Sequence, residues 1–145
     1  MNIKLLFTTV VVLAVHITPL AEGQSAANMY YIAFKVQVSE VFSQLFSKSG
    51  QYGQPGNPIF ESKLTSIVNG MARCHVEGMK NFDDIHVQKA YNAVANGGTY
   101  ADAKMAFENS LAFSAADSEE SRKIVARALT RSAEQGKRCV SAVMQ

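Results

Sequence analysis

The chain has 145 residues, of which 48% are hydrophobic and 18% charged, and its formal net charge is +2. This length suits one domain with its own core and is short for two ordinary domains. The apolar fraction is large enough to offset the entropy of ordering, which excludes a disordered chain, and the composition also excludes collagen, coiled-coil arrays and low-complexity segments.

The first 23 residues have the pattern of a secretory signal peptide. The positive charge of Lys4 precedes an unbroken run of apolar residues and Thr at 5–15, and small residues lie close to Gly23. This run is too short to cross a bilayer, which takes about 20 apolar residues. We therefore predict cleavage after Gly23 and secretion of residues 24–145 as one extracellular domain, without membrane insertion. A buried amino-terminal helix is the alternative for the first segment.

A long helix is predicted from Ser25 to Lys48, ended by Gly50, which can take the left-handed conformation of a helix cap. Apolar residues recur in it at steps of three and four, as on one helix face. They are Tyr31, Phe34, Val38, Val41, Phe42 and Leu45. The Gly-rich segment 50–57 is predicted to be a loop with Tyr52 exposed at its tip. Tyr52 is a candidate partner-binding residue, because Tyr on mobile loops is common at binding surfaces; a plain connection is the alternative.

Capping signals delimit the three helices of the middle of the chain. Asn57 before Pro58 predicts the start of a helix that runs to about Lys80. Asp83 is predicted to cap a shorter helix, and Thr99 with Asp102 forms a capping box for a fourth. The residues predicted to face the core are Phe60, Leu64, Ile67, Met71 and Cys74, then Ile85, Val87, Tyr91 and Val94, then Tyr100, Ala103, Phe107 and Leu111.

The last predicted helix begins at 117–120 and has two contrasting faces. Its predicted inner face consists of Val125, Ala128, Leu129, Ser132, Cys139, Val140 and Val143. Six basic residues and one acidic residue lie between Arg122 and Arg138. Four of the basic residues share one face, which we name the basic stripe: Lys123, Arg127, Arg131 and Arg138. Such a stripe can steer an acidic protein partner, a sulfated glycan or an anionic membrane, and a solvated helix face is the alternative.

Two cysteines, Cys74 and Cys139, lie on the inner faces of two predicted helices. In an oxidising compartment such a pair usually forms a disulfide, and the only intramolecular pairing joins Cys74 to Cys139. An intermolecular bridge or two free buried thiols are the alternatives. The sequence thus predicts an all-α, compact single-domain bundle of about five helices, four of them long, with one disulfide, after a cleaved signal peptide.

No motif for catalysis, metal binding or cofactor binding is found, so we predict that the protein is not an enzyme and holds no metal or cofactor. His75 and His86 are the only histidines after the predicted signal peptide, and neither belongs to a zinc motif. His75 is interpreted as structural, and His86 as a solvated residue at a helix start. A nucleic-acid partner is not expected, since no aromatic and basic platform is present.

Three segments of the chain resemble the albicin and anophensin family of anopheline mosquito salivary proteins: Asn28-Met29-Tyr30-Tyr31, Gly56-Asn57-Pro58 and 69–74. The resemblance implies a secreted, non-enzymatic inhibitor of host plasma defence proteins, either the alternative complement convertase or the kallikrein-kinin contact system. The implied partner is a host plasma protein or protease complex, and the basic stripe adds an anionic glycan as a further candidate partner. The alternative function is a secreted helical carrier of small hydrophobic ligands. A carrier predicts a lined cavity, whereas the inhibitor predicts a filled core.

Overall fold

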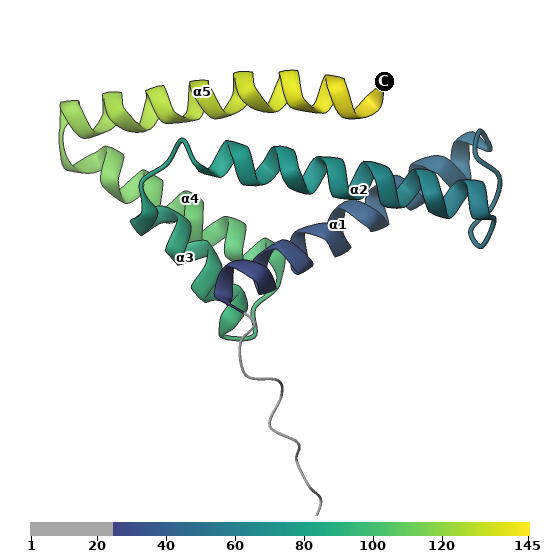
Figure 1. The fold of residues 1–145 in the computed structure, drawn as a ribbon. Helices are drawn as coiled ribbons and strands as arrows, with labels where there is room; N and C mark the ends of the chain where they lie inside the picture. Colours follow the sequence, from purple (N-terminus) through teal and green to yellow (C-terminus); the bar gives the residue numbers. More distant parts are fainter. Residues whose placement is uncertain (1–24) are drawn as a thin grey trace, which may run out of the picture.

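A computed structural model describes residues 25–145 of the chain, and within them it contains five helices and no strand (Figure 1). The helices are α1 (Ala26–Ser49), α2 (Pro58–Met79), α3 (Asp84–Ala95), α4 (Tyr100–Asp117) and α5 (Glu119–Met144). The predicted all-α domain of about five helices, four of them long, is confirmed. The predicted signal peptide, 1–23, lies outside the described residues.

The helix ends follow the capping signals of the sequence. Asn57 Oδ1 accepts a hydrogen bond from the backbone N–H of Ile59 at the start of α2, and Gly50 ends α1 with φ of 66°. At the start of α4, Thr99 Oγ1 accepts from the Asp102 N–H and Asp102 Oδ2 accepts from the Thr99 N–H, which completes the predicted capping box. Asp83 precedes α3 as predicted, but its side chain makes no capping hydrogen bond.

The helices pack as a ring in which α5 lies along α2 and α4, and α1 packs against α2 and α3. The loop that joins α1 to α2 is at one end of the molecule, and α5 begins at the opposite end (Figure 1). In consequence the amino half of α1 is covered by α3 and α4, whereas its carboxyl half is paired mainly with α2.

Two separate clusters of buried side chains hold this ring together. The first joins α1, α2, α3 and α4, and its fully buried members are Tyr30, Met79, Val87, Ala90, Val94 and Ala103. The second joins the carboxyl half of α1 to the amino half of α2 through Phe46, Phe60, Leu64, Ile67 and Val68. The core is therefore divided into two parts.

Several residues predicted to face the core are exposed instead. Val41 and Leu45 of α1 are 46% and 52% exposed, because no helix covers this side of the carboxyl half of α1. Phe46 is buried in their place. Ile85 of α3 and Leu129 of α5 are also exposed, at 65% and 48%.

His86 is buried, so the prediction of a solvated histidine is wrong. Only 7% of its surface is exposed, and its Nδ1 lies 2.8 Å from Ser110 Oγ on α4. The cause is the tight packing of α3 on α4, which places the first turn of α3 against the middle of α4.

Candidate functional site

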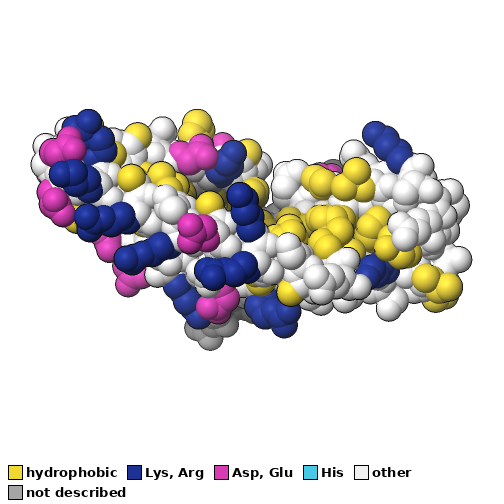
Figure 2. Space-filling view, turned by 90° about the horizontal axis from the view of Figure 1, so that it is seen from above, with side chains coloured by type: hydrophobic (Ala, Val, Ile, Leu, Met, Phe, Trp, Pro, Cys, Tyr) yellow, Lys and Arg dark blue, Asp and Glu magenta, His cyan; other side chains and the backbone are white. Residues whose placement is uncertain are grey.

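The basic stripe lies on the outer face of α5, and all four of its side chains are exposed. In Figure 2 this side of the molecule shows dark blue Lys and Arg side chains over one half, with acidic side chains between them, and an apolar area over the other half. Lys123 is paired with Glu119, at 3.7 Å between Nζ and Oε1. Within residues 25–145, no salt bridge involves Arg127, Arg131 or Arg138. The predicted shared face exists, and its role in binding stays a prediction.

Tyr52 is not the exposed loop tip that the sequence predicts. Its side chain is half-buried, its ring centroid lies 4.6 Å from that of Phe46, and it joins the second core cluster. The ring also has Lys63 Nζ at 6.0 Å from its centroid. Since this loop lies at the opposite end of the molecule from the start of α5, the structure does not unite Tyr52 and Lys123 in one surface (Figure 1).

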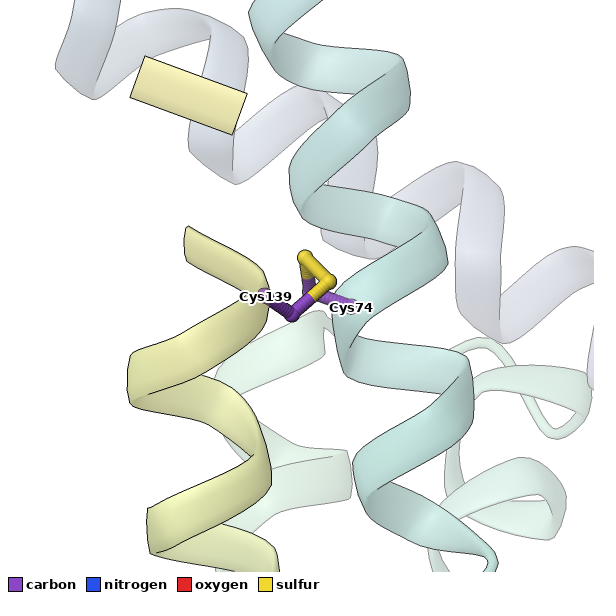
Figure 3. The surroundings of a disulfide bond; sticks show 2 residues. All are labelled: Cys74 and Cys139. Atoms are coloured by element: carbon purple, nitrogen blue, oxygen red, sulfur yellow. A yellow bond between two sulfur atoms is a disulfide. The ribbon is translucent and has the colours of Figure 1, made fainter. Parts of the chain in front are cut away.

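The predicted disulfide is confirmed: Cys74 of α2 and Cys139 of α5 are bonded, with 5.5 Å between their Cα atoms (Figure 3). The intermolecular bridge and the free thiols are thereby excluded within the described chain, which has no free cysteine. The bond joins the carboxyl half of α2 to the carboxyl part of α5, and the two cysteines are 65 residues apart in sequence.

Small residues on both sides of Cys74 bring α2 and α5 close together. A Cβ atom on Gly70 would lie 2.6 Å from Val143 Cγ1, and one on Gly78 would lie 3.1 Å from Ser132 Oγ. Because Gly70, Cys74 and Gly78 are four residues apart, they share one face of α2. We call this contact line between α2 and α5 the glycine seam.

An apolar cavity of about 420 Å³ lies beside the glycine seam. Side chains from α1, α2, α4 and α5, together with Phe82 of the α2–α3 connection, surround it. The lining residues are Phe34, Met71, Cys74, His75, Gly78, Met79, Phe82, Phe107, Leu129, Ser132, Gly136 and Val140. None of them is Asp, Glu, Lys or Arg, so His75 is the only titratable side chain in the lining.

His75 is held in an aromatic cluster at one side of this cavity. Its ring stacks on Phe34 at 4.2 Å between centroids, and its Nε2 shares a hydrogen bond of 2.7 Å with the Tyr30 hydroxyl. Burial lowers the pKa of the His75 imidazole to about 4 and raises the pKa of the Tyr30 hydroxyl. The imidazole is therefore neutral near pH 7, and the cavity lining carries no charge.

The cavity is not among the features predicted from the sequence, although one signal for it was present. Gly136 lies at the centre of the inner face of α5, where a core side chain is expected, and nothing lies within 4 Å of a Cβ atom placed there. A glycine at a core position of an otherwise regular helix is such a signal. His75, interpreted as structural, is indeed packed and hydrogen-bonded, and it also lines the cavity.

Residues 25–145 contain no group of three or more His, Cys, Asp or Glu side chains that could hold a metal ion. In the same part of the chain, no helix has the length and apolar character needed to cross a membrane.

No protein-family model, curated protein or solved structure matches this chain. The resemblance to the albicin and anophensin family therefore stays a prediction.

Proposed function

We propose that the protein is a secreted binding protein that inhibits host plasma defence proteins by docking on them, without catalysing a reaction. The observation that supports this proposal is the basic stripe, whose three arginines are exposed on one face of α5 and make no salt bridge within residues 25–145. The proposed partner is an acidic surface of the alternative complement convertase or of a kallikrein-kinin contact factor. A sulfated glycan is the further partner.

Exposed charges mainly affect the rate at which a protein and its partner associate. Each surface charge contributes little to affinity, but a row of like charges raises the association rate with a partner of opposite charge. The disulfide fixes α5 on α2, so the stripe is presented on a helix that loses little conformational freedom on binding.

The proposal is tested with residues 24–145, purified in oxidised form, in human plasma at physiological salt. We expect dose-dependent inhibition of complement-mediated haemolysis by the alternative pathway, or of kallikrein generation. The reduced and alkylated protein is the control for folding. If the oxidised protein leaves both assays unchanged, inhibition of plasma defence is wrong.

The cavity favours a second function, the carriage of small hydrophobic ligands. A filled core was expected for a protein that acts by docking alone, whereas the space between α2 and α5 is apolar and unfilled by side chains. The two functions are compatible, because the cavity and the basic stripe lie on opposite sides of α5. At 100° per residue, Gly136 faces about 180° away from the centre of the stripe.

A further inference from the structure

The inner face of α5 has a gap at its centre. Val125, Ser132, Gly136 and Val143 follow one another at steps of seven, four and seven, so they share this face of the helix. Val143 is in contact range of α2 at the glycine seam, and Val125 is buried. Gly136, between them, has no atom within 4 Å of its Cβ position. The space in front of Gly136 is therefore unfilled, although the helix is held close to α2 on both sides.

The glycine seam explains why this space cannot close. The disulfide and the contacts of Gly70 and Gly78 fix the separation of α2 and α5. Phe34 and Phe107 stand on the far side, on helices α1 and α4 that are held in place by the first core cluster. Since each wall is fixed by packing elsewhere, collapse of the cavity would break one of these contacts.

The lining selects the chemistry of an occupant. An ionised group placed against this uncharged, apolar lining would lose hydration without gaining a partner, so the lining favours uncharged ligands over ionised ones. The Ser132 hydroxyl can donate one hydrogen bond and can also accept, whereas His75 Nε2 is already used by Tyr30. The lining is thus suited to a ligand with an apolar body and one neutral polar group.

The volume sets the size of the occupant. An apolar cavity of about 150 Å³ is known to bind benzene. Scaled by volume, the cavity of about 420 Å³ has room for about 17 non-hydrogen atoms. The cavity volume of about 420 Å³ is within the range of ligand pockets in proteins, about 300–1,000 Å³.

We propose that the cavity in front of Gly136 binds an uncharged, mainly apolar small molecule of about 17 non-hydrogen atoms, with its polar group near Ser132. The proposal rests on the carrier function and adds to it the site and the ligand class. Gly136 is the residue that determines binding, because any larger side chain at this position occupies the ligand's space.

The decisive variant is Gly136→Leu. The new side chain enters open space, and the change from Gly to a strong helix former is favourable in a helix interior. The variant is therefore expected to fold at least as stably as the wild type while its cavity is filled. Ala142→Leu is the matched control, since it adds a Leu side chain to the same helix at an exposed position about 120° away from Gly136.

The probe is N-phenyl-1-naphthylamine, an uncharged fluorophore of about the required size, titrated into the oxidised protein at pH 7.4. We expect wild type and Ala142→Leu to bind it equally, and Gly136→Leu to bind it at least about tenfold more weakly with an unchanged or higher Tm. Competition with 1-dodecanol, dodecanoate and dodecylamine, which share one chain and differ in charge, tests the ligand class. The alcohol is expected to displace the probe at concentrations at least about tenfold lower than either ion.

The possible failures are distinguishable. If wild type binds neither the probe nor the alcohol, the carrier function and this site are both wrong. If wild type and Gly136→Leu bind the probe equally, the carrier function stands and the site is wrong. If either ion competes as well as the alcohol, the proposed ligand class is wrong.

Discussion

Gly70 and Gly136 are both helical glycines that face the α2–α5 interface, yet a side chain would meet opposite surroundings at the two positions. A Cβ atom on Gly70 would lie 2.6 and 2.8 Å from the two methyl groups of Val143, and one on Gly136 would meet nothing within 4 Å. The close packing of α2 on α5 therefore depends on the first glycine, and the cavity depends on the second.

The same substitution is expected to change stability with opposite sign at these two sites. Gly136→Ala should raise the free energy of unfolding by about 1 kcal/mol, the difference in helix propensity between Gly and Ala. Gly70→Ala gains the same propensity term but forces α2 and α5 apart, so we expect a net loss of about 1–2 kcal/mol. Urea denaturation followed by circular dichroism measures both values. Two changes of the same sign would contradict the close packing at the glycine seam.

His75 makes the protein less stable in acid. Because burial lowers its pKa to about 4 in the folded protein, the unfolded chain takes up a proton as the pH falls below the usual value of about 6.5, while the folded protein does not. The contribution of His75 to stability is therefore complete above about pH 6.5, falls between about 6.5 and 4, and levels off below, with a total loss of about 3 kcal/mol.

The measurement is the free energy of unfolding of wild type and His75→Phe between pH 7.5 and pH 4. Carboxyl groups titrate in both proteins, so the difference between the two isolates His75. We expect this difference to shift in favour of the variant as the pH falls, by up to about 3 kcal/mol. A difference that is independent of pH would show that the folded imidazole titrates normally.

At the level of single helices, α5 differs from the others in how little of it is buried. Of its 26 residues only Val125 is buried, and its outer face carries the basic stripe. A helix of this kind depends on the disulfide and the glycine seam for its position. Its charges therefore point to solvent, where a partner can reach them.

Charge reversal within the stripe should slow association with an acidic partner. In Arg127→Glu/Arg131→Glu the net charge falls by four units at exposed positions, so we expect the association rate constant for the plasma partner to fall by about tenfold or more, with a smaller change in dissociation. Lys48→Glu/Lys89→Glu makes the same change of charge on α1 and α3 and is the control. Surface plasmon resonance at two salt concentrations measures the rates; equal effects of the two pairs would remove the basic stripe from the binding surface.

The sequence was sufficient for features that depend on local chemistry. Asn57 and the pair of Thr99 and Asp102 begin their helices as predicted, since a cap needs only neighbouring residues. The pairing of Cys74 with Cys139 had one intramolecular solution. The starts of α2 and α4 in the chain could therefore be predicted from their capping residues.

Features that depend on which helix covers which face could not be predicted in the same way. Val41 and Leu45 have regular core spacing and are exposed because α3 and α4 reach only the other half of α1. Tyr52 and His86 were predicted to be solvated and are covered by residues distant in sequence. The cavity in front of Gly136 likewise requires walls from four helices, which no single amphipathic pattern describes.

In the whole molecule, the disulfide is the link that completes the ring of helices. The α3–α4 hairpin and the amino half of α1 share the first core cluster, and the α1–α2 hairpin has the second. Apart from the disulfide, α5 is joined to these parts by few buried side chains. The bond closes a loop of 65 residues, and removal of such a native bond costs about 2–5 kcal/mol.

We therefore expect loss of the disulfide to release α5 before the rest of the domain opens. In Cys74→Ser/Cys139→Ser, backbone amides in the carboxyl half of α5 should lose protection against hydrogen exchange, while those of α3 and α4 keep most of theirs, because the first core cluster does not include α5. Hydrogen exchange measured by mass spectrometry on peptides from each helix tests this, with oxidised wild type as the reference. The cavity should open in the same variant, since one of its walls is α5, so binding of N-phenyl-1-naphthylamine should weaken in parallel. An equal loss of protection in all five helices would instead mean that the domain unfolds as one cooperative unit, with α5 as integral to it as the two buried clusters.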